Sequence, residues 1–171
     1  MNFLIIGQPN VGKTSLYNLI TNSDYNIIHK SVGTTRDWHV ANLKESKNIK
    51  IYDTPGVFIS NGKIINRNYE SLINKIDILI FLIDYKKSDY LNDRELINNF
   101  RKFNKKIILV VNKDDNFKEN KNLNILGLKK IFYISCSHNL GIVDLINYLN
   151  SHSTNNLREK IYNYSIGIYG K

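Results

Sequence analysis

One stretch of the chain has the residue types and spacing of a phosphate-binding loop. Residues 7–14 read Gly-Gln-Pro-Asn-Val-Gly-Lys-Thr and fit the pattern G-x-x-x-x-G-K-[ST]. An apolar run precedes the loop and apolar residues at helical spacing follow it, as this strand–loop–helix motif requires. We expect backbone N–H groups and the helix N-terminus to hold the phosphates of a nucleotide. The alternative is a chance glycine turn before a helix, which the motifs further along the chain weaken.

The residue types within this loop have distinct chemical uses. Gly7 and Gly12 let the backbone approach an anion without a Cβ in between. The Lys13 ammonium can reach the β- and γ-phosphates as a catalytic charge, and the Thr14 hydroxyl can bind a bridging Mg²⁺. The predicted nucleotide contacts of this segment are Gly7, Gln8, Pro9, Asn10, Val11, Gly12, Lys13, Thr14 and Ser15.

A second motif selects the base. Residues 112–115, Asn-Lys-Asp-Asp, fit N-K-x-D and follow an apolar run that suits a buried strand. A carboxylate at Asp115 can accept both the N1–H and the exocyclic amine of guanine, a donor pair that adenine lacks. Asn112 can bind the base edge or brace the phosphate loop, and the Lys113 stem can cover the purine face. The motif therefore predicts GTP rather than ATP.

Ser135 and Cys136 end the last predicted core strand and complete the expected base pocket. A backbone N–H there can point at guanine O6. Cys136, the one cysteine of the chain, is then a small buried residue rather than a nucleophile.

A third motif, Asp53-Thr54-Pro55-Gly56, ends another predicted strand, and we expect its four residues to contact the nucleotide. Asp53 is placed to hold Mg²⁺ through water, and the Gly56 N–H can meet the γ-phosphate in catalysis. In the loop predicted over residues 24–37, Thr35 is the candidate second protein oxygen on Mg²⁺, with Thr34 as the alternative. The γ-phosphate would then order both loops and hydrolysis would release them.

The order of the elements predicts the fold class. Strands are expected at Phe3–Ile6, 39–43, 48–52, 78–83, 107–111 and 131–134, and amphipathic or apolar helical stripes after residues 13, 68, 90 and 141. The segments at 57–67 and 116–128 read as a loop and as a poor helix or loop. This alternation predicts an α/β P-loop NTPase of the small G-protein type, with a mostly parallel central sheet and helices on both faces.

Composition limits the kind of protein. At 171 residues with 42% hydrophobic and 23% charged side chains, we expect one folded core. The sequence shows neither a secretory signal nor a membrane span, and a single cysteine suits a reducing compartment, so we expect a cytoplasmic protein without membrane contacts. The net charge of +9 invites nucleic-acid binding. The dense basic run at residues 101–106 fits that interpretation or, more simply, a solvated helix end.

The end of the chain suggests a second unit. We expect a GTPase domain over residues 1–151, a polar linker over 152–163 and an apolar strand over 164–171. Residues 165–171 have the character of residues 2–8, an apolar strand that ends in glycine, so they fit the first strand of a second GTPase domain. An edge strand of the first domain or a coincidental tail is the alternative.

Together the motifs carry a family resemblance. G-Q-P-N-V-G-K-T, G-T-T-R-D, D-T-P-G, N-K-D-D and S-C-S resemble the Era/MnmE/Der group of translation-factor-class GTPases, most closely the first GTPase domain of Der (EngA). The resemblance covers nearly the whole chain. Pro55 and Thr34 match Era or MnmE rather than Der, and Cys136 replaces a usual alanine.

The resemblance implies a function. It implies a GTP-hydrolysing switch whose parent protein acts in large ribosomal subunit assembly, with a second GTPase domain and a KH-like domain in the same chain. Val57 occupies the position of the water-orienting glutamine of Ras-type enzymes. The resemblance implies instead that Asn10 binds K⁺ beside the phosphates, whereas a plain turn residue is the alternative. An Era-like or MnmE-like RNA-related GTPase, or a binding module with negligible hydrolysis, remains open.

Overall fold

A computed structural model of the chain describes residues 1–21, 27–29, 38–54, 59–60, 63–64, 67–87, 89–113 and 121–161. Some predicted site residues lie outside these ranges. They are Thr34, Thr35, Pro55, Gly56 and Asp115, and Val57 and the predicted strand at residues 164–171 also lie outside them.

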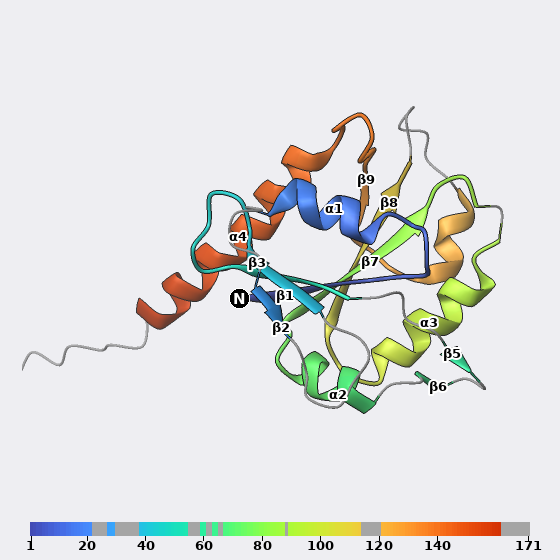
Figure 1. Cartoon of the computed structure of the whole chain (residues 1–171), viewed down its shortest axis with the longest axis horizontal. Helices are drawn as coiled ribbons and strands as arrows, with labels where there is room; N and C mark the ends of the chain where they lie inside the picture. Colours follow the sequence, from blue (N-terminus) through green and yellow to red (C-terminus); the bar gives the residue numbers. More distant parts are fainter. Residues whose placement is uncertain are drawn as a thin grey trace, which may run out of the picture.

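The centre of the molecule is a seven-stranded sheet in the order β2-β3-β4-β1-β7-β8-β9 (Figure 1). Its five consecutive strands from β4 to β9 run parallel, while β2 and β3 pair antiparallel at one edge. The strands are β1 (Asn2–Ile6), β2 (Ile27–His29), β3 (Trp38–Asn42), β4 (Lys50–Asp53), β7 (Ile78–Asp84), β8 (Lys106–Asn112) and β9 (Ile131–Tyr133). A separate two-stranded sheet joins β5 (Ile59–Ser60) to β6 (Lys63–Ile64). The predicted mostly parallel sheet is confirmed.

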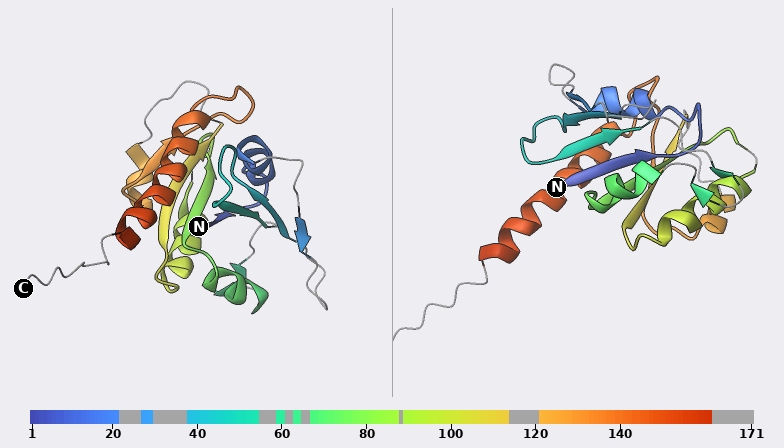
Figure 2. Two further views of the ribbon diagram at one scale, coloured as in Figure 1. Left: turned by 90° about the vertical axis from the view of Figure 1, so that its left-hand side faces the viewer. Right: turned by 60° about the horizontal axis from the view of Figure 1, so that its bottom comes forward.

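Helices cover both faces of the large sheet. Helices α1 (Lys13–Ile20) and α4 (Ile142–Ile161) lie on one face, and α2 (Arg67–Asn74), α3 (Leu91–Arg101) and the 3-10 helix η2 (Lys121–Leu126) lie on the other (Figures 1 and 2). Alternate residues of each central strand divide between the two layers. Phe3 and Ile5 pack in the core beneath α1 and α4, whereas Leu4 and Ile6 pack beneath α2 and α3. This double burial explains why the central strands are apolar without interruption.

Strand β7 shows this burial on both faces of the sheet most clearly. All six residues from Ile78 to Ile83 are buried, with exposed fractions of 2% or less. Each side chain of this kind stabilises the fold by roughly 1.5–3 kcal/mol relative to exposure. The strand lies between β1 and β8, so the segment that follows it must emerge between the ends of those two strands.

The structure differs from the sequence-based expectations in three segments. The predicted loop over residues 24–37 contains β2, and the loop over 57–67 contains β5 and β6. Two-residue and three-residue strands are too short to leave a readable periodicity. Residues 152–161, expected as a linker, continue helix α4 to Ile161. Their polar composition fits the described helix, and their linker role stays a prediction.

Candidate functional site

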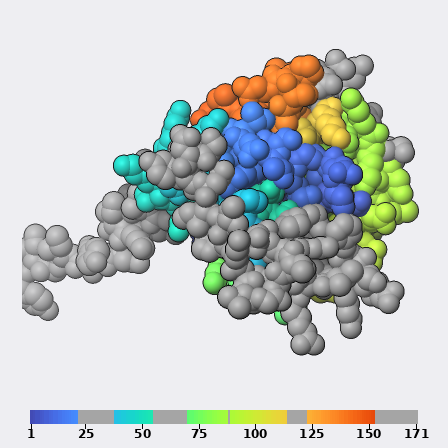
Figure 3. Space-filling model, viewed as in Figure 1, coloured from blue at the N-terminus to red at the C-terminus, as the bar shows by residue number. Residues whose placement is uncertain are grey.

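The predicted motifs meet at one edge of the sheet, where the parallel strands have their carboxyl ends. The phosphate loop follows β1, Asp53 ends β4, Asn112 ends β8, and Ser135 and Cys136 follow β9. In Figure 3 the blue surface of the N-terminal segment borders yellow and orange surface contributed by residues near β8 and after β9. Ligands of open parallel sheets bind at this edge.

The phosphate loop is held by its own backbone and by the sheet. Gly12 has a φ of 97°, and a Cβ there would overlap the amide of Asn112. Gly7 has a φ of 148°, and a Cβ there would overlap the carbonyl group of Leu82. Both glycines are therefore required for the loop to lie this close to β7 and β8.

Lys13 lies inside the loop as the phosphate-binding interpretation requires. Its ammonium donates a 2.7 Å hydrogen bond to the Gln8 carbonyl oxygen, and the residue is only 7% exposed. Burial lowers the pKa of Lys13, and the carboxylate of Asp53 partly offsets this effect. Among the described residues no carboxylate forms an ion pair with Lys13, so this buried cation is well suited to an incoming phosphate.

Thr14 and Asp53, the two residues expected to hold Mg²⁺ that the structure describes, lie side by side. The Thr14 hydroxyl donates to Asp53 Oδ2 at 2.9 Å. Burial raises the pKa of Asp53, while the Thr14 hydrogen bond and the Lys13 charge act in the opposite direction. Asp53 Oδ1 is buried and has no hydrogen-bond partner among the described residues. A hydroxyl beside one carboxylate fits Mg²⁺, which takes few protein ligands and completes its shell with phosphate and water.

Asn112 joins the phosphate loop to the loop after β9. Its Nδ2 donates to the Val11 carbonyl oxygen at 2.9 Å, and its Oδ1 accepts from the Cys136 N–H at 3.1 Å. Of the two roles considered for Asn112, the structure shows the one in which its side chain braces the phosphate loop. A backbone N–H at Ser135 or Cys136 was expected to point at guanine O6, and in this structure the Cys136 N–H donates to Asn112.

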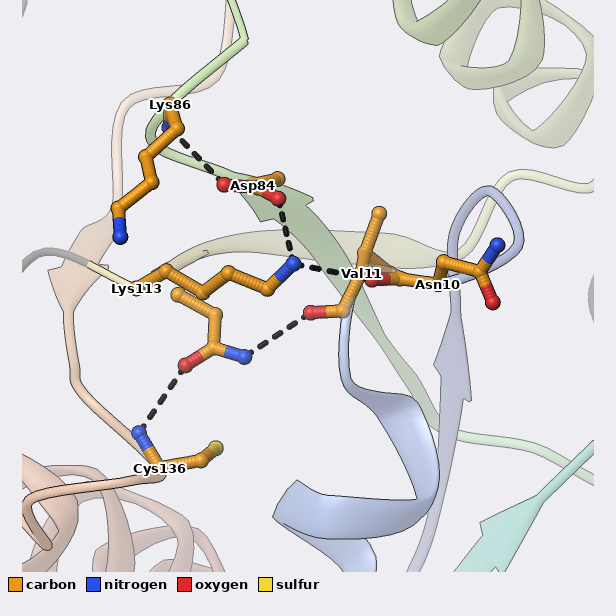
Figure 4. A network of polar contacts seen from close by, with 7 residues as sticks. Asn10, Val11, Asp84, Lys86, Lys113 and Cys136 are labelled. Carbon is orange, nitrogen blue, oxygen red and sulfur yellow. Dashed lines mark hydrogen bonds and ion pairs between the residues drawn. The ribbon is translucent and has the colours of Figure 1, made fainter.

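Lys113 forms a second brace beside the first. Its Nζ lies 2.6 Å from Asp84 Oδ2 and 3.2 Å from the Asn10 carbonyl oxygen (Figure 4). Asn10 and Lys113 both adopt left-handed backbone conformations, with φ of 65° and 66°. The Asn10 side chain is exposed and points away from Lys113. Lys113 thus holds the carbonyl oxygen of Asn10, while the exposed side-chain amide of Asn10 can meet solvent or an ion.

A cavity of ≈ 320 Å³ lies where the two braces meet. It is lined by Gly12, Ser15, Lys86, Asn112, Lys113, Cys136 and Ser137. Five of these seven residues are predicted nucleotide contacts, and Lys86 and Ser137 are the other two. Burial raises the pKa of Cys136 to about 11, so the thiol is protonated at neutral pH and lines the cavity as an inert group.

Not every predicted contact residue faces this cavity. Thr54 is 4% exposed and packs against β1, with its hydroxyl 3.5 Å from the Ile5 carbonyl oxygen. Ser135 is fully buried, and its hydroxyl lies 3.1 Å from that of Ser137. These two residues support the loops at the sheet edge rather than line the cavity.

Most of the chain matches a known protein family. Residues 2–113, which include the phosphate loop and the first two residues of N-K-x-D, match the family described as 50S ribosome-binding GTPase. The chain belongs to this family.

Individual proteins that are similar to the chain along most of its length are named GTPase Der. The chain is 35% identical to GTPase Der of Buchnera aphidicola subsp. Schizaphis graminum (strain Sg) over 92% of its length, which covers 37% of that protein. It is 36% identical to GTPase Der of Borrelia garinii subsp. bavariensis over 98% of its length, which covers 40% of that protein. The chain thus spans well under half the length of these curated relatives.

Solved structures support the fold. An S. thermophilus NFeoB mutant bound to GDP matches 86% of the chain and 59% of its own, with a TM-score of 0.66 and 21% identity. An Aquifex aeolicus Era mutant bound to GDP.AlF4- matches 86% of the chain and 55% of its own, with a TM-score of 0.61 and 26% identity. Within the described residues, no helix of this GTPase family member is long and apolar enough to cross a membrane.

Sequence reasoning missed three residues of the GTPase site: Asp84, Lys86 and Ser137. The Lys86 N–H donates to Oδ1 of Asp84, the last residue of β7, at 2.9 Å, so Lys86 lies in the turn that follows the strand. For Asp84 and Lys86, knowledge of the strand order would have predicted a place in the site. Because β7 lies between the strand before the phosphate loop and the strand before N-K-x-D, its carboxyl end had to enter the site.

Proposed function

We propose that this chain binds GTP at the described edge of the sheet and hydrolyses it to GDP and phosphate. The single observation that carries the proposal is the Asn112 brace, which connects the phosphate loop through Val11 and the expected base pocket through Cys136. One side chain thereby couples the position of the phosphates to the position of the base. Membership of the GTPase family supports the same conclusion.

Several roles belong to this proposal. Lys13 and the loop backbone bind the phosphates, Thr14 and Thr35 bind Mg²⁺ directly, and Asp53 binds it through water. The Gly56 N–H meets the γ-phosphate, and Asp115 reads guanine. Asn10 holds K⁺ beside the phosphates, because Val57 cannot orient water as a glutamine would. When bound, Mg²⁺ supplies charge that stabilises the leaving phosphate oxygens.

The proposal extends to the parent protein. Its relatives are named GTPase Der, and its family is described as 50S ribosome-binding. We infer that the intact protein is cytoplasmic and uses this domain as a switch during large ribosomal subunit assembly. Residues 164–171 then begin a second GTPase domain, and a KH-like domain follows it. An Era-like RNA-related role is the alternative, since Pro55 and Thr34 match that group.

Single-turnover GTP hydrolysis with Mg²⁺, in matched K⁺ and Na⁺ buffers, tests the activity. Faster hydrolysis in K⁺, lost in Asn10→Ala, is the expected result. Tight GTP binding without measurable hydrolysis in either buffer would make the domain a binding module. Hydrolysis that is equal in both buffers would remove the K⁺ role alone.

Base recognition has a separate test. Asp115→Asn exchanges the carboxylate acceptor for an amide, so GTP should weaken and xanthosine triphosphate should bind in its place. The affinities of both nucleotides, measured by competition with a fluorescent guanine nucleotide, give the answer. An unchanged preference for GTP would contradict the assignment of Asp115.

A further inference from the structure

The basic run at residues 101–106 does not act as one surface. Arg101 donates to the carbonyl oxygens of Leu126 and Gly127, both at 3.0 Å, so it joins α3 to η2. Lys102 bonds to Asn99 on its own helix. Lys106 is different, because it begins β8 and projects to the face covered by α4. Its Nζ lies 2.9 Å from His152 Nε2.

Lys106 meets a second lysine over one aromatic ring. The Nζ atoms of Lys106 and Lys130 lie 5.5 and 4.9 Å from the ring centroid of Tyr148. Lys130 also lies 4.8 Å from the ring of Phe132, which packs 4.9 Å from Tyr148. We call Lys106, Lys130, Phe132, Tyr148 and His152 the lysine–tyrosine cluster. It lies at the amino ends of β8 and β9, opposite the nucleotide edge of the sheet.

The cluster presents unused donors to solvent. Because an ammonium only donates, His152 Nε2 accepts from Lys106, and its Nδ1–H donates to the Tyr148 carbonyl oxygen at 2.9 Å. Within the part of the chain that the structure describes, two N–H groups of Lys106 and all three of Lys130 have no hydrogen-bond acceptor. Both lysines are exposed. Among the described residues, the ion pairs are Lys87–Asp93 and Lys113–Asp84, so no carboxylate neutralises either cluster lysine.

Two like charges gathered at one ring repel each other, and an anion that contacts both ammoniums relieves the repulsion. Cation–π contacts at an exposed site contribute only about 0.5–1 kcal/mol each, so they hold the lysines in place without neutralising them. A surface of this kind, on a chain of net charge +9, suits an extended polyanion. A pair of fixed ammoniums beside aromatic rings is a phosphodiester-binding arrangement.

We propose that the lysine–tyrosine cluster binds the phosphate backbone of RNA. The choice of RNA over DNA rests on the proposed ribosomal function, whereas the phosphodiester chemistry rests on the cluster itself. Lys106 and Lys130 each contact a phosphate group, and Tyr148 fixes both side chains. The binding is independent of sequence, since backbone contacts carry no base information.

Fluorescence anisotropy of a fluorescein-labelled single-stranded RNA of about 16 nucleotides tests the proposal. The GDP-loaded chain is titrated at several KCl concentrations, with DNA of the same sequence as a second probe. In Lys106→Gln/Lys130→Gln, the slope of log K against log salt should fall in magnitude by about 1.4, since each single-strand phosphate contact contributes about 0.7. Affinity for RNA should fall at least about tenfold at low salt.

The matched control is Lys75→Gln/Lys102→Gln, which removes the same charge from exposed lysines on the α2 and α3 face. We expect it to change RNA affinity by less than about twofold. Equal losses in both double variants would overturn the proposal, because only net charge would then matter. Tighter binding of DNA than of RNA would overturn the RNA assignment. Displacement of RNA by polyglutamate of equal charge at equal concentration would assign the surface to an acidic protein segment.

Fluorescent GDP binding, measured on the same preparations, separates this proposal from the proposed function. Neither double variant touches the nucleotide edge, so GDP affinity should stay unchanged in both. RNA binding that depends on the cluster in a chain without GDP affinity would overturn the GTPase assignment and leave the RNA surface. Normal GDP affinity with no RNA binding by the wild-type chain would overturn the RNA surface alone.

Discussion

The two ends of the parallel strands hold their lysines in different ways. At the carboxyl ends, Lys13 and Lys113 are bound to carbonyl oxygens of the phosphate loop, and Lys113 also pairs with Asp84. At the amino ends, Lys106 and Lys130 lie over the ring of Tyr148 without a described carboxylate partner. The first arrangement fixes two ammoniums against the phosphate loop, while the second leaves donors on an exposed surface.

The two ways of holding lysines suit different kinds of ligand. Hydrogen bonds from buried ammoniums to backbone oxygens give a site a defined geometry, which a nucleotide requires. Aromatic rings hold an ammonium without using its N–H groups, so the donors stay available to a ligand of variable shape. Substitutions of the same kind at the two edges should therefore have different consequences.

Lys13→Ala and Lys106→Ala make the sharpest pair. Removing Lys13 deletes a buried charged donor at the phosphates, so we expect nucleotide affinity to fall at least about 100-fold, or roughly 2.7 kcal/mol. The same change at Lys106 should leave nucleotide affinity within about twofold. Titration with fluorescent GDP measures both. A large loss in Lys106→Ala would show that the two edges are coupled and would contradict the comparison.

Tyr148→Leu tests the amino edge by stability. The ring contacts Phe132 and His152 and carries two lysines, so its loss should destabilise the fold by about 1–2 kcal/mol. Urea unfolding of the nucleotide-free chain gives the change in free energy. Tyr148→Phe is the control, because it keeps the ring and should match the wild type. Equal destabilisation by both changes would place the effect in the hydroxyl group.

Asp84→Asn tests the carboxyl edge. The substitution keeps the shape of the side chain and removes the charge that holds Lys113 against the phosphate loop. Asp84 and Lys113 are 21% and 39% exposed, so solvent screens the pair, and we expect GDP to bind about fivefold more weakly. Asp77→Asn, whose carboxylate accepts from the Asn2 N–H at the other edge, should not change GDP affinity. Matching losses in the two variants would contradict the role of Asp84.

The carboxyl edge was also the more predictable of the two. The phosphate loop, Asp53 and Asn112 were found from spacing, because a phosphate site needs glycine, lysine and hydroxyl at fixed intervals. Continuous apolar runs gave β1, β7 and β8 correctly. The amino edge left no motif, since Lys106, Lys130 and Tyr148 come from three separate segments. Only the register of β8 with β9 and the packing of α4 bring them together.

Other limits have equally physical causes. Asp84 was missed because a single carboxylate after an apolar strand is common, and its importance depends on the strand order. The helical continuation of α4 over residues 152–161 was missed because the stripe Ile142, Leu145, Ile146 and Leu149 ends where the apolar residues end. A helix can continue into polar sequence once its first turns are packed.

The smallest effect concerns a buried carboxylate near the phosphate loop. Asp93 of α3 is fully buried, accepts from Lys87 at 3.1 Å through Oδ2, and has no partner for Oδ1 among the described residues. Burial raises the pKa of Asp93 above its ordinary value of 3.8, although the Lys87 ammonium opposes the shift. Above pH 3.8, the carboxyl group of Asp93 therefore holds its proton more firmly in the folded chain than in the unfolded chain. The contribution of Asp93 to stability therefore falls as pH rises from about 3.8 through the raised pKa.

Asp93→Asn replaces the titrating carboxyl group with an amide that does not titrate. The free energy of unfolding should therefore decline less between acidic and neutral pH than it does in the wild type. Urea midpoints of the nucleotide-free chain at several pH values measure the decline. Leu96→Ala on the same helix is the control, because a cavity should lower the midpoint by a similar amount at every pH. If Asp93→Asn declined as steeply as the wild type, Asp93 would stay charged in the fold. Its contact with Lys87 would then be an ion pair of the same kind as the pair between Lys113 and Asp84.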